Sequence, residues 1–250
     1  MRLDLPPGYR LVRSGGAQVV AREDAVAWVE QALAAAGTLR AYAEAHAERV
    51  LAGGRGPVPV VAAPRGPWAV RHYRRGGAAA ALLGDRYFRG AALRPFAELA
   101  VSEALRRHGV ATPEVHAAGV YPAGAWYRGD VATTYIPDAG DLAELTLSAA
   151  RWPEAERVHA WRAAGALLSR FFATGAVHAD LNLRNVLVSR AGPVAHLLDL
   201  DRCTPPRAPD LRAHRRMRAR FERSRRKLEA RAGRPVGAAE LDAFEAELQS

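Results

Sequence analysis

The chain of 250 residues is poor in several residue types that mark common protein classes. Its one cysteine, Cys203, excludes an intramolecular disulfide and a zinc site built on cysteine pairs, and it fits a reducing compartment. No run of about twenty apolar residues is long enough to cross a bilayer. Residues 1–7 contain no apolar segment before their prolines, so we expect no secretory signal and a cytoplasmic location.

Motifs of other enzyme classes are missing as well. The sequence has no His-Glu-x-x-His metalloprotease motif and no Gly-x-Ser-x-Gly nucleophile elbow. Twenty-two glycines and sixteen prolines are spread along the chain, which favours many turns over a helical bundle. With 49% apolar residues, the chain can bury a substantial core as one large domain or as two lobes.

Positive charge is concentrated near the C-terminus. Residues 202–235 hold thirteen Lys or Arg and three Asp or Glu, which accounts for the whole net charge of +10. Such a segment suits an anionic surface: nucleic acid, phospholipid or a lipopolysaccharide precursor. A solvated helix in an arginine-rich protein is the alternative.

The order of patterns predicts a strand-rich first half and a helical second half. A hairpin is expected at residues 9–21, followed by two amphipathic helices capped by Asp24 and Thr38. Further strands are expected at 115–120 and 126–136, and a hinge at 137–140. The longest helix, at 153–173, carries an apolar stripe that is typical of a core. The sequence therefore predicts an α+β fold.

One segment has the layout of a phosphotransferase loop. Asp180 is followed after four residues by Asn185, then by a short apolar strand, and Asp199 closes a second apolar strand. Asp180 can accept a proton from an attacking hydroxyl, and Asn185 and Asp199 offer the oxygen ligands that Mg²⁺ prefers. We therefore predict Asp180 as the catalytic base and Asn185 with Asp199 as the metal site.

The neighbours of these residues allow more than one interpretation. His178 is expected to pack the loop, because Asp180 already fills the position of the base. Asn182 and Arg184 lie beside the base, and Arg184 is either a forked donor to the transferred phosphate or a surface arginine. Asp201 is either a second acid near the metal or an exposed turn residue.

A phosphate-binding region is predicted in the first half. The glycine-rich segment at 53–56 lies between two expected strands, so Gly54, Arg55 and Gly56 can bring backbone N–H groups close to phosphates. A kinase also needs a cation on the next strand, paired with a helical glutamate. The one lysine, Lys227, lies in the basic segment, so Arg71 is the predicted cation, with Glu98 as its partner and Glu103 as the alternative.

Together these segments resemble the lipopolysaccharide kinase family of the protein-kinase-like superfamily, and most closely its kinases for 3-deoxy-D-manno-octulosonic acid (Kdo). The matching motifs are Gly54–Gly56, WAVRHYRRGG at 68–77, DRY at 85–87, RPFAE at 94–98, DLNLRN at 180–185 and LDLD at 198–201. The resemblance implies a bilobal protein-kinase-like fold, with an N-lobe at 1–136 and a C-lobe at 137–250.

The resemblance also implies a reaction. ATP with Mg²⁺ would phosphorylate the 4-hydroxyl of Kdo on Kdo-lipid A, at the cytoplasmic face of the inner membrane. Because Kdo carries a carboxylate and lipid A carries phosphates, Arg74 or Arg75 is expected to bind the acceptor. Seven arginines are expected to face the anionic leaflet: Arg215, Arg216, Arg218, Arg220, Arg223, Arg225 and Arg226.

Two other functions compete with this one. The first is an aminoglycoside- or choline-type phosphotransferase, which would share the loop but need no basic segment. The second is an inactive kinase fold that binds anions. A protein kinase is disfavoured, because the proline-rich stretch at 204–209 leaves no room for an activation segment after Asp199. No nucleic acid partner is expected, and the oligomeric state stays open.

Overall fold

The structure, a computed structural model, describes residues 5–52, 56–74, 84–88, 93–148, 151–192 and 194–248. The chain forms two compact units, the first from residues 1–100 and 114–135 and the second from residues 101–113 and 136–250. Residues 101–113 therefore pack with the second unit, although they precede the hinge predicted at 137–140. Each unit has its own hydrophobic core.

The first unit is built on an antiparallel sheet. Its strands in the described residues run in the order β1-β2-β7-β8-β5-β4-β3, with β6 beside β8. Their bounds are β1 Tyr9–Ser14, β2 Ala17–Arg22, β3 Arg49–Leu51, β4 Val58–Val61, β5 Trp68–His72, β6 Tyr87–Phe88, β7 Val115–Ala123 and β8 Trp126–Thr134. The hairpin predicted at 9–21 is confirmed, and Gly15 and Gly16 form its turn with φ angles of 54° and 87°.

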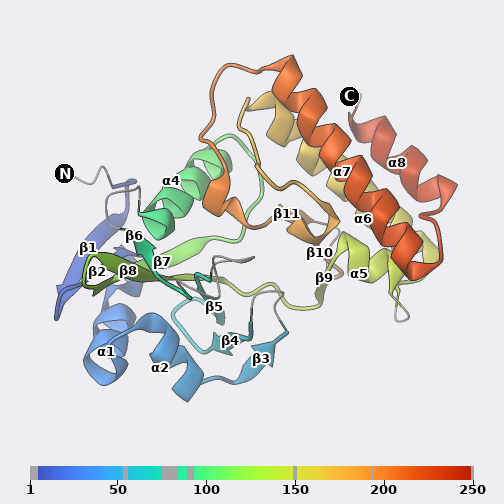
Figure 1. Ribbon diagram of the computed structural model, residues 1–250. Helices are drawn as coiled ribbons and strands as arrows, with labels where there is room; N and C mark the ends of the chain where they lie inside the picture. Colours follow the sequence, from blue (N-terminus) through green and yellow to red (C-terminus); the bar gives the residue numbers. More distant parts are fainter. Residues whose placement is uncertain are drawn as a thin grey trace. The chain divides into compact units, whose positions relative to one another are not determined.

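Both faces of this sheet are covered by helices (Figure 1). Successive strand residues point to opposite faces, so Val19 packs in a cluster with Trp28 while Val20 packs in a cluster with Phe96. One face is covered by α1 and α2, and the other by the N-terminal part of α4. The bounds of these helices are α1 Val26–Ala36, α2 Leu39–Ala45 and α4 Arg94–Arg107, and the short 3₁₀ helix η1 spans Glu23–Ala25.

The N-terminal fifty residues are an integral part of this unit. The ring of Trp28 lies 5.2 Å from that of Tyr42 and 5.0 Å from that of Trp68, centroid to centroid. Thr38 caps α2 as predicted, since its hydroxyl accepts a hydrogen bond from the backbone N–H of Ala41. The predicted cap at Asp24 is wrong, because this residue lies inside η1 and α1 has no side-chain cap.

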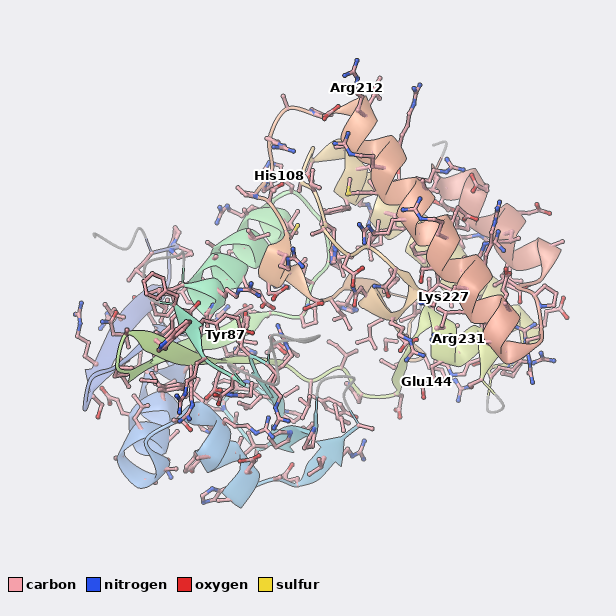
Figure 2. The ribbon with its side chains drawn as sticks, in the orientation of Figure 1. Tyr87, His108, Glu144, Arg212, Lys227 and Arg231 are labelled. Carbon is pink, nitrogen blue, oxygen red and sulfur yellow. The ribbon has the colours of Figure 1, made fainter. Side chains whose placement is uncertain are left out.

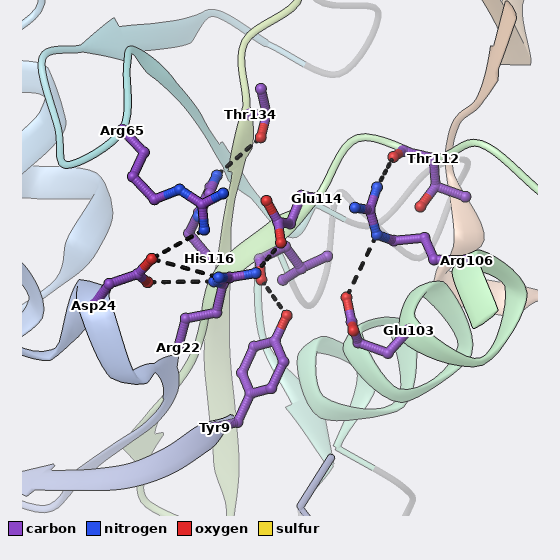
Figure 3. A network of polar contacts seen from close by, with 11 residues as sticks. Tyr9, Arg22, Asp24, Arg65, Glu103, Arg106, Thr112, Glu114, His116 and Thr134 are labelled. Atoms are coloured by element: carbon purple, nitrogen blue, oxygen red, sulfur yellow. Dashed lines mark hydrogen bonds and ion pairs between the residues drawn. The ribbon is translucent and has the colours of Figure 1, made fainter. Parts of the chain in front are cut away.

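Asp24 takes part in an ion-pair network instead (Figure 3). Its carboxylate contacts Arg22 at 3.2 Å and Arg65 at 3.1 Å, and Arg22 also contacts Glu114, next to the start of β7. The arginines outweigh the effect of burial, so the pKa of Asp24 is lowered. The network therefore joins the end of β2 to the loop before β5 and to the start of β7.

The second unit combines a small sheet with helices. In the described residues the strand order is β11-β10-β9. The bounds are β9 Ala139–Asp141, β10 Val186–Ser189, β11 Ala195–Leu197, α5 Leu142–Leu147, α6 Glu154–Ala173, α7 Leu211–Ala232 and α8 Ala238–Leu248, with 3₁₀ helices η2 Leu183–Asn185 and η3 Leu200–Arg202. The helix predicted at 153–173 is confirmed, and its apolar stripe is core. Together the two units confirm the α+β class.

Helices α6, α7 and α8 pack around one aromatic cluster. Trp161 of α6 lies 6.4 Å from Phe221 and 5.5 Å from Phe244, centroid to centroid. Gly165 permits this packing, because a Cβ there would lie 2.5 Å from the carbonyl oxygen of Phe244. In the part of the chain that the structure describes, no helix has the length and apolar character needed to span a membrane.

Candidate active site

The predicted catalytic loop is held at the ends of two paired strands. Val186 of β10 pairs with Leu197 of β11, and the backbone N–H of Leu198 donates to the carbonyl of Asn185 at 2.9 Å. Asn185 and Asp199 therefore flank neighbouring strand ends. Asp199 itself has the left-handed conformation, with φ 60° and ψ 54°. Asp adopts this conformation more readily than most residues, and here it turns the chain from β11 into η3.

Both asparagines of the sequence organise this loop. The Nδ2 atoms of Asn182 and Asn185 each donate to the backbone carbonyl of Asp180 at 2.8 Å. The Oδ1 atom of Asn182 accepts from the backbone N–H of Arg184 at 2.9 Å and caps η2. The position of Asp180 is thus fixed through its backbone, while its carboxylate is 57% exposed and accessible to a substrate.

His178 connects the loop to the strand that carries Asp199. The ring is buried, its Nδ1 accepts from the backbone N–H of Asp180 at 3.2 Å, and its Nε2 donates to the carbonyl of Leu198 at 2.9 Å. This pair of bonds defines a neutral ring with its hydrogen on Nε2. His178 therefore packs the loop, in agreement with the expectation from the sequence.

The arginines around Asp180 come from two elements. Arg184 is exposed on η2. The charge of Arg184 also acts on Asp141. Burial raises the pKa of Asp141, and the positive charge of Arg184 offsets part of that rise. Arg220 of α7 places Nη1 at 3.4 Å from Oδ1 of Asp180. Sequence reasoning did not find this contact, because it assigned Arg220 to a membrane surface and no pattern links residues that are 40 positions apart.

A magnesium ion is compatible with the donors that the loop offers. Asn185 uses its amide nitrogen within the loop, so its Oδ1 is the atom suited to a cation, and Asp199 supplies a carboxylate. Among the described residues no group of three or more His, Cys, Asp or Glu side chains could hold a metal. Two protein oxygens fit Mg²⁺, which usually takes its remaining ligands from water and phosphates.

In the first unit, Arg71 pairs with Glu98. Nη2 of Arg71 lies 2.6 Å and 2.8 Å from the two carboxylate oxygens, and the hydroxyl of Tyr73 donates to the same carboxylate. Glu98 is buried, whereas 32% of the Arg71 side chain is exposed. The alternative partner Glu103 instead lies near Arg106, at 3.8 Å. Arg71 thus has a fixed position, and part of its side chain is open to solvent.

Part of the predicted phosphate-binding region can be described. Gly56 has a φ of 123°, and a Cβ there would lie 3.0 Å from Nη1 of Arg74, so the guanidinium of Arg74 lies against Gly56. Gly54, Arg55 and Arg75 lie outside the described residues. Tyr135, the last residue of the first unit, has a basic partner: Nη1 of Arg49 donates a hydrogen bond to its hydroxyl at 2.8 Å.

A histidine next to Arg71 bridges two carboxylates. Nδ1 of His72 lies 2.6 Å from Oδ1 of the buried Asp130, and Nε2 lies 3.0 Å from Oδ2 of Asp85, which also contacts Arg128. Burial lowers the pKa of His72, but the hydrogen bonds and charges of Asp130 and Asp85 outweigh it, so the pKa is raised above 6.5. A protonated ring donates to both carboxylates, which ties β5 to Asp85 across the segment 75–83.

This network predicts a pH-dependent stability. The pKa of His72 is raised in the folded state, so its contribution is complete below pH 6.5 and is lost as the pH rises through the folded-state pKa. The variant His72→Gln should lower the free energy of unfolding by about 3 kcal/mol at acidic pH, because it leaves the Asp130 carboxylate without its charged partner. Urea denaturation of both proteins from pH 5.5 to 8.5 checks this. A difference that does not change with pH would contradict it.

Comparisons with known proteins found a matching family model and similar sequences. A family model described as Lipopolysaccharide kinase (Kdo/WaaP) family matches residues 40–239. The chain is 38% identical over 152 residues to a 3-deoxy-D-manno-octulosonic acid kinase of Stenotrophomonas maltophilia (strain R551-3), covering 60% of this chain and 58% of that protein. It is 37% identical over 184 residues to the kinase of the same name of Xanthomonas axonopodis pv. citri (strain 306), covering 73% and 71%.

A solved structure also resembles the chain. It is described as WaaP in complex with acyl carrier protein, and it matches with a TM-score of 0.53 and 17% identity, covering 83% of this chain and 80% of that one. At this identity the similarity concerns the fold alone, and it confirms the expected kinase-like fold. The matched region of the family model begins inside α2, so β1, β2 and α1 precede it.

Proposed function

Because the chain belongs to the lipopolysaccharide kinase (Kdo/WaaP) family, we propose that it transfers the γ-phosphate of ATP to the 4-hydroxyl of Kdo on Kdo-lipid A. The observation that carries this proposal is the loop in which both asparagines bind the backbone of Asp180 and leave its carboxylate exposed. The identity to Kdo kinases supports the choice of acceptor. The alignment spans less than two thirds of the Stenotrophomonas protein, so the acceptor is inferred from similarity over that part.

In the proposed reaction the carboxylate of Asp180 takes the proton of the acceptor hydroxyl. The hydroxyl oxygen bonds to the γ-phosphorus, the bond from that phosphorus to the bridging oxygen breaks, and ADP leaves. Asn185 and Asp199 would hold Mg²⁺, which neutralises phosphate charge when it is bound. Arg184, exposed on η2, is assigned to the oxygens of the transferred phosphate.

Arg71 is proposed to bind the phosphates of ATP. Replacing it in Arg71→Ala should raise the KM for ATP roughly 10- to 100-fold, since a charged hydrogen bond is lost, and leave the KM for the acceptor nearly unchanged. Arg71→Lys should retain part of the activity, because it keeps the charge without the fork. Steady-state kinetics with both substrates varied measures this.

Tyr73→Phe provides a matched control for Arg71. It removes one hydrogen bond from the Glu98 carboxylate but keeps the ring over which the Arg71 guanidinium lies, at 4.9 Å from the centroid. The KM for ATP should therefore stay close to that of the wild type. An Arg71→Ala enzyme with a normal KM for ATP would refute the assignment.

Helix α7 is proposed to hold the protein on the anionic inner face of the inner membrane. Met217 and Phe221 are buried on one side of the helix, and most of the arginines expected to face the leaflet are exposed. The expectation that Arg225 faces the leaflet is wrong. Its side chain is mostly buried and pairs with Glu222 and Glu229. Arg218 pairs with Glu245 and Arg220 with Asp180. The exposed residues that keep the assignment are Arg215, Arg216, Arg223 and Arg226.

The membrane assignment is tested with liposomes. Each exposed cation contributes about 1 kcal/mol near an anionic surface, so changing these four to Glu should abolish binding to liposomes with anionic lipid. Wild-type binding should weaken as salt rises. If liposome binding did not depend on salt and survived the four changes, the membrane assignment would be wrong and α7 would be a solvated helix.

The proposed activity is tested by a panel of acceptors. Purified protein with Mg-ATP is offered Kdo-lipid A, lipid A without Kdo, an aminoglycoside, choline and a protein acceptor, and transfer of labelled phosphate is measured. We expect transfer to Kdo-lipid A alone, with the phosphate at the 4-position by NMR. Transfer to the aminoglycoside or choline, with none to Kdo-lipid A, would overturn the proposal in favour of a small-molecule phosphotransferase.

A further inference from the structure

Arg220 lies directly beside the proposed base. Its Nη1 is 3.4 Å from Oδ1 of Asp180, and the two side chains are 49% and 57% exposed. Within the described part of the chain, Asp180 is the one acidic side chain in an ion pair with Arg220. An exposed pair of this length contributes little to stability, so the contact needs another explanation.

Buried contacts determine where Arg220 emerges. Met217 and Phe221, three residues before it and one residue after it, are buried in the core of the second unit. The Sδ atom of Met217 also accepts a hydrogen bond from the backbone N–H of His178 at 3.2 Å. These contacts fix the rotation of α7 against the loop. Arg220 is therefore placed beside Asp180 by the core and does not depend on the ion pair for its position.

The place of Arg220 suits an anion that enters with the acceptor. Its guanidinium is half exposed and lies beside the carboxylate that would face the acceptor hydroxyl. An anionic group next to that hydroxyl would come within reach of the guanidinium. Other cations continue the same exposed stripe along α7, whose length Figure 2 marks with Arg212, Lys227 and Arg231. The stripe consists of Arg216, Arg220, Arg223 and Lys227.

We propose that Arg220 binds an anionic group of the acceptor, a carboxylate or a phosphate, next to the hydroxyl that Asp180 deprotonates. This inference rests on the proposed function and adds the residue that selects an anionic acceptor. Without acceptor, the guanidinium contacts Asp180. The acceptor's anion takes over the guanidinium from the carboxylate of Asp180, and it does so at little cost because the exposed ion pair is weak. Arginine suits this role, since its fork binds both oxygens of such a group.

The test compares wild type and Arg220→Gln on three acceptors. These are Kdo-lipid A, the same molecule with its sugar carboxylate amidated, and the same molecule with its lipid A phosphates removed. The variant should lose roughly 10- to 100-fold in kcat/KM on Kdo-lipid A, as expected for a lost charged hydrogen bond, with an unchanged KM for ATP. On the acceptor that lacks the recognised anion, wild type and variant should be equal, which identifies the carboxylate or the phosphate.

Two controls match the change in charge. Arg212→Gln and Arg231→Gln each remove one exposed arginine near an end of α7 (Figure 2), and both should keep the wild-type kcat/KM. Arg220→Lys should recover part of the lost activity. An equal loss on all three acceptors would show that Arg220 acts on Asp180 alone, and a raised KM for ATP would show that it binds nucleotide. Either result overturns the proposal.

A binding measurement separates this proposal from the proposed function. Titration calorimetry with Kdo-lipid A in detergent micelles, on Asp180→Asn and on Asp180→Asn with Arg220→Gln, reports the anion site without turnover. If wild type transfers no phosphate to any Kdo acceptor but binding needs Arg220, the proposed reaction fails and the anion site stands. If Kdo-lipid A does not bind, or binds equally to both variants, the role of Arg220 is refuted.

Discussion

The variant Asp180→Asn should bind ATP normally and lose roughly 10²- to 10⁴-fold in kcat, the contribution typical of general acid-base catalysis. An amide has nearly the shape of the carboxylate but cannot take a proton from the acceptor hydroxyl. The loop should keep its structure, because Asn182 and Asn185 bind the backbone carbonyl of residue 180 and not its side chain. Turnover of Kdo-lipid A and the Kd for ATP are the two measurements.

The change at Asp180 has an internal control. Its one side-chain ion pair in the described residues, with Arg220, is exposed and contributes little to folding. The thermal midpoint of Asp180→Asn should therefore match that of the wild type. A variant that is stable, binds ATP and keeps a near wild-type kcat would show that another group acts as the base.

The variant Asp199→Asn should lose metal-dependent catalysis. Charge stabilisation by a bound metal is worth several kcal/mol in the transition state, so a decrease on the order of 10³-fold is expected. Asn is the suitable replacement, because residue 199 has a φ of 60° and Asn tolerates that conformation better than Ala does. When activity is measured against Mg²⁺ concentration, the half-saturating Mg²⁺ concentration of the variant should be much higher than that of the wild type.

Metal binding can be followed without turnover. Electron paramagnetic resonance of Mn²⁺ with the nucleotide present should show weaker binding to Asp199→Asn than to wild type. Asn185→Ala should weaken Mn²⁺ binding as well, and it should also loosen the loop, because it removes the hydrogen bond to the Asp180 carbonyl. Unchanged Mn²⁺ affinity in both variants would place the metal elsewhere.

Much of the loop could be predicted from the sequence because its logic is local. Asp180, Asn185 and Asp199 stand in a fixed order on turns around two short apolar strands, and short strands at this spacing pair with each other. Arg71 followed from elimination, since the one lysine lies elsewhere. Its partner was expected on the following helix as Glu98, with Glu103 as the alternative, and the structure pairs it with Glu98. These arguments needed no knowledge of packing between distant segments.

The parts that escaped prediction depend on such packing. The stripe on α7 was visible in the sequence, but the rotation of the helix against the loop is set by Met217 and its contact with His178. The same holds for Arg225, whose acidic partners one turn away keep it from solvent. A periodic pattern gives the faces of a helix, but it does not show which segment lies against each face.

The pairing of β2 with β7 has a consequence for how the chain folds during synthesis. Gln18 pairs with Val120, so the β1–β2 hairpin is synthesised about one hundred residues before the strand that pairs with it. Until then its unpaired edge is exposed and open to pairing with another chain. The sheet of the first unit is complete only when β8 has been synthesised. Until then the nascent first half is the part of the chain most exposed to aggregation and most in need of a chaperone.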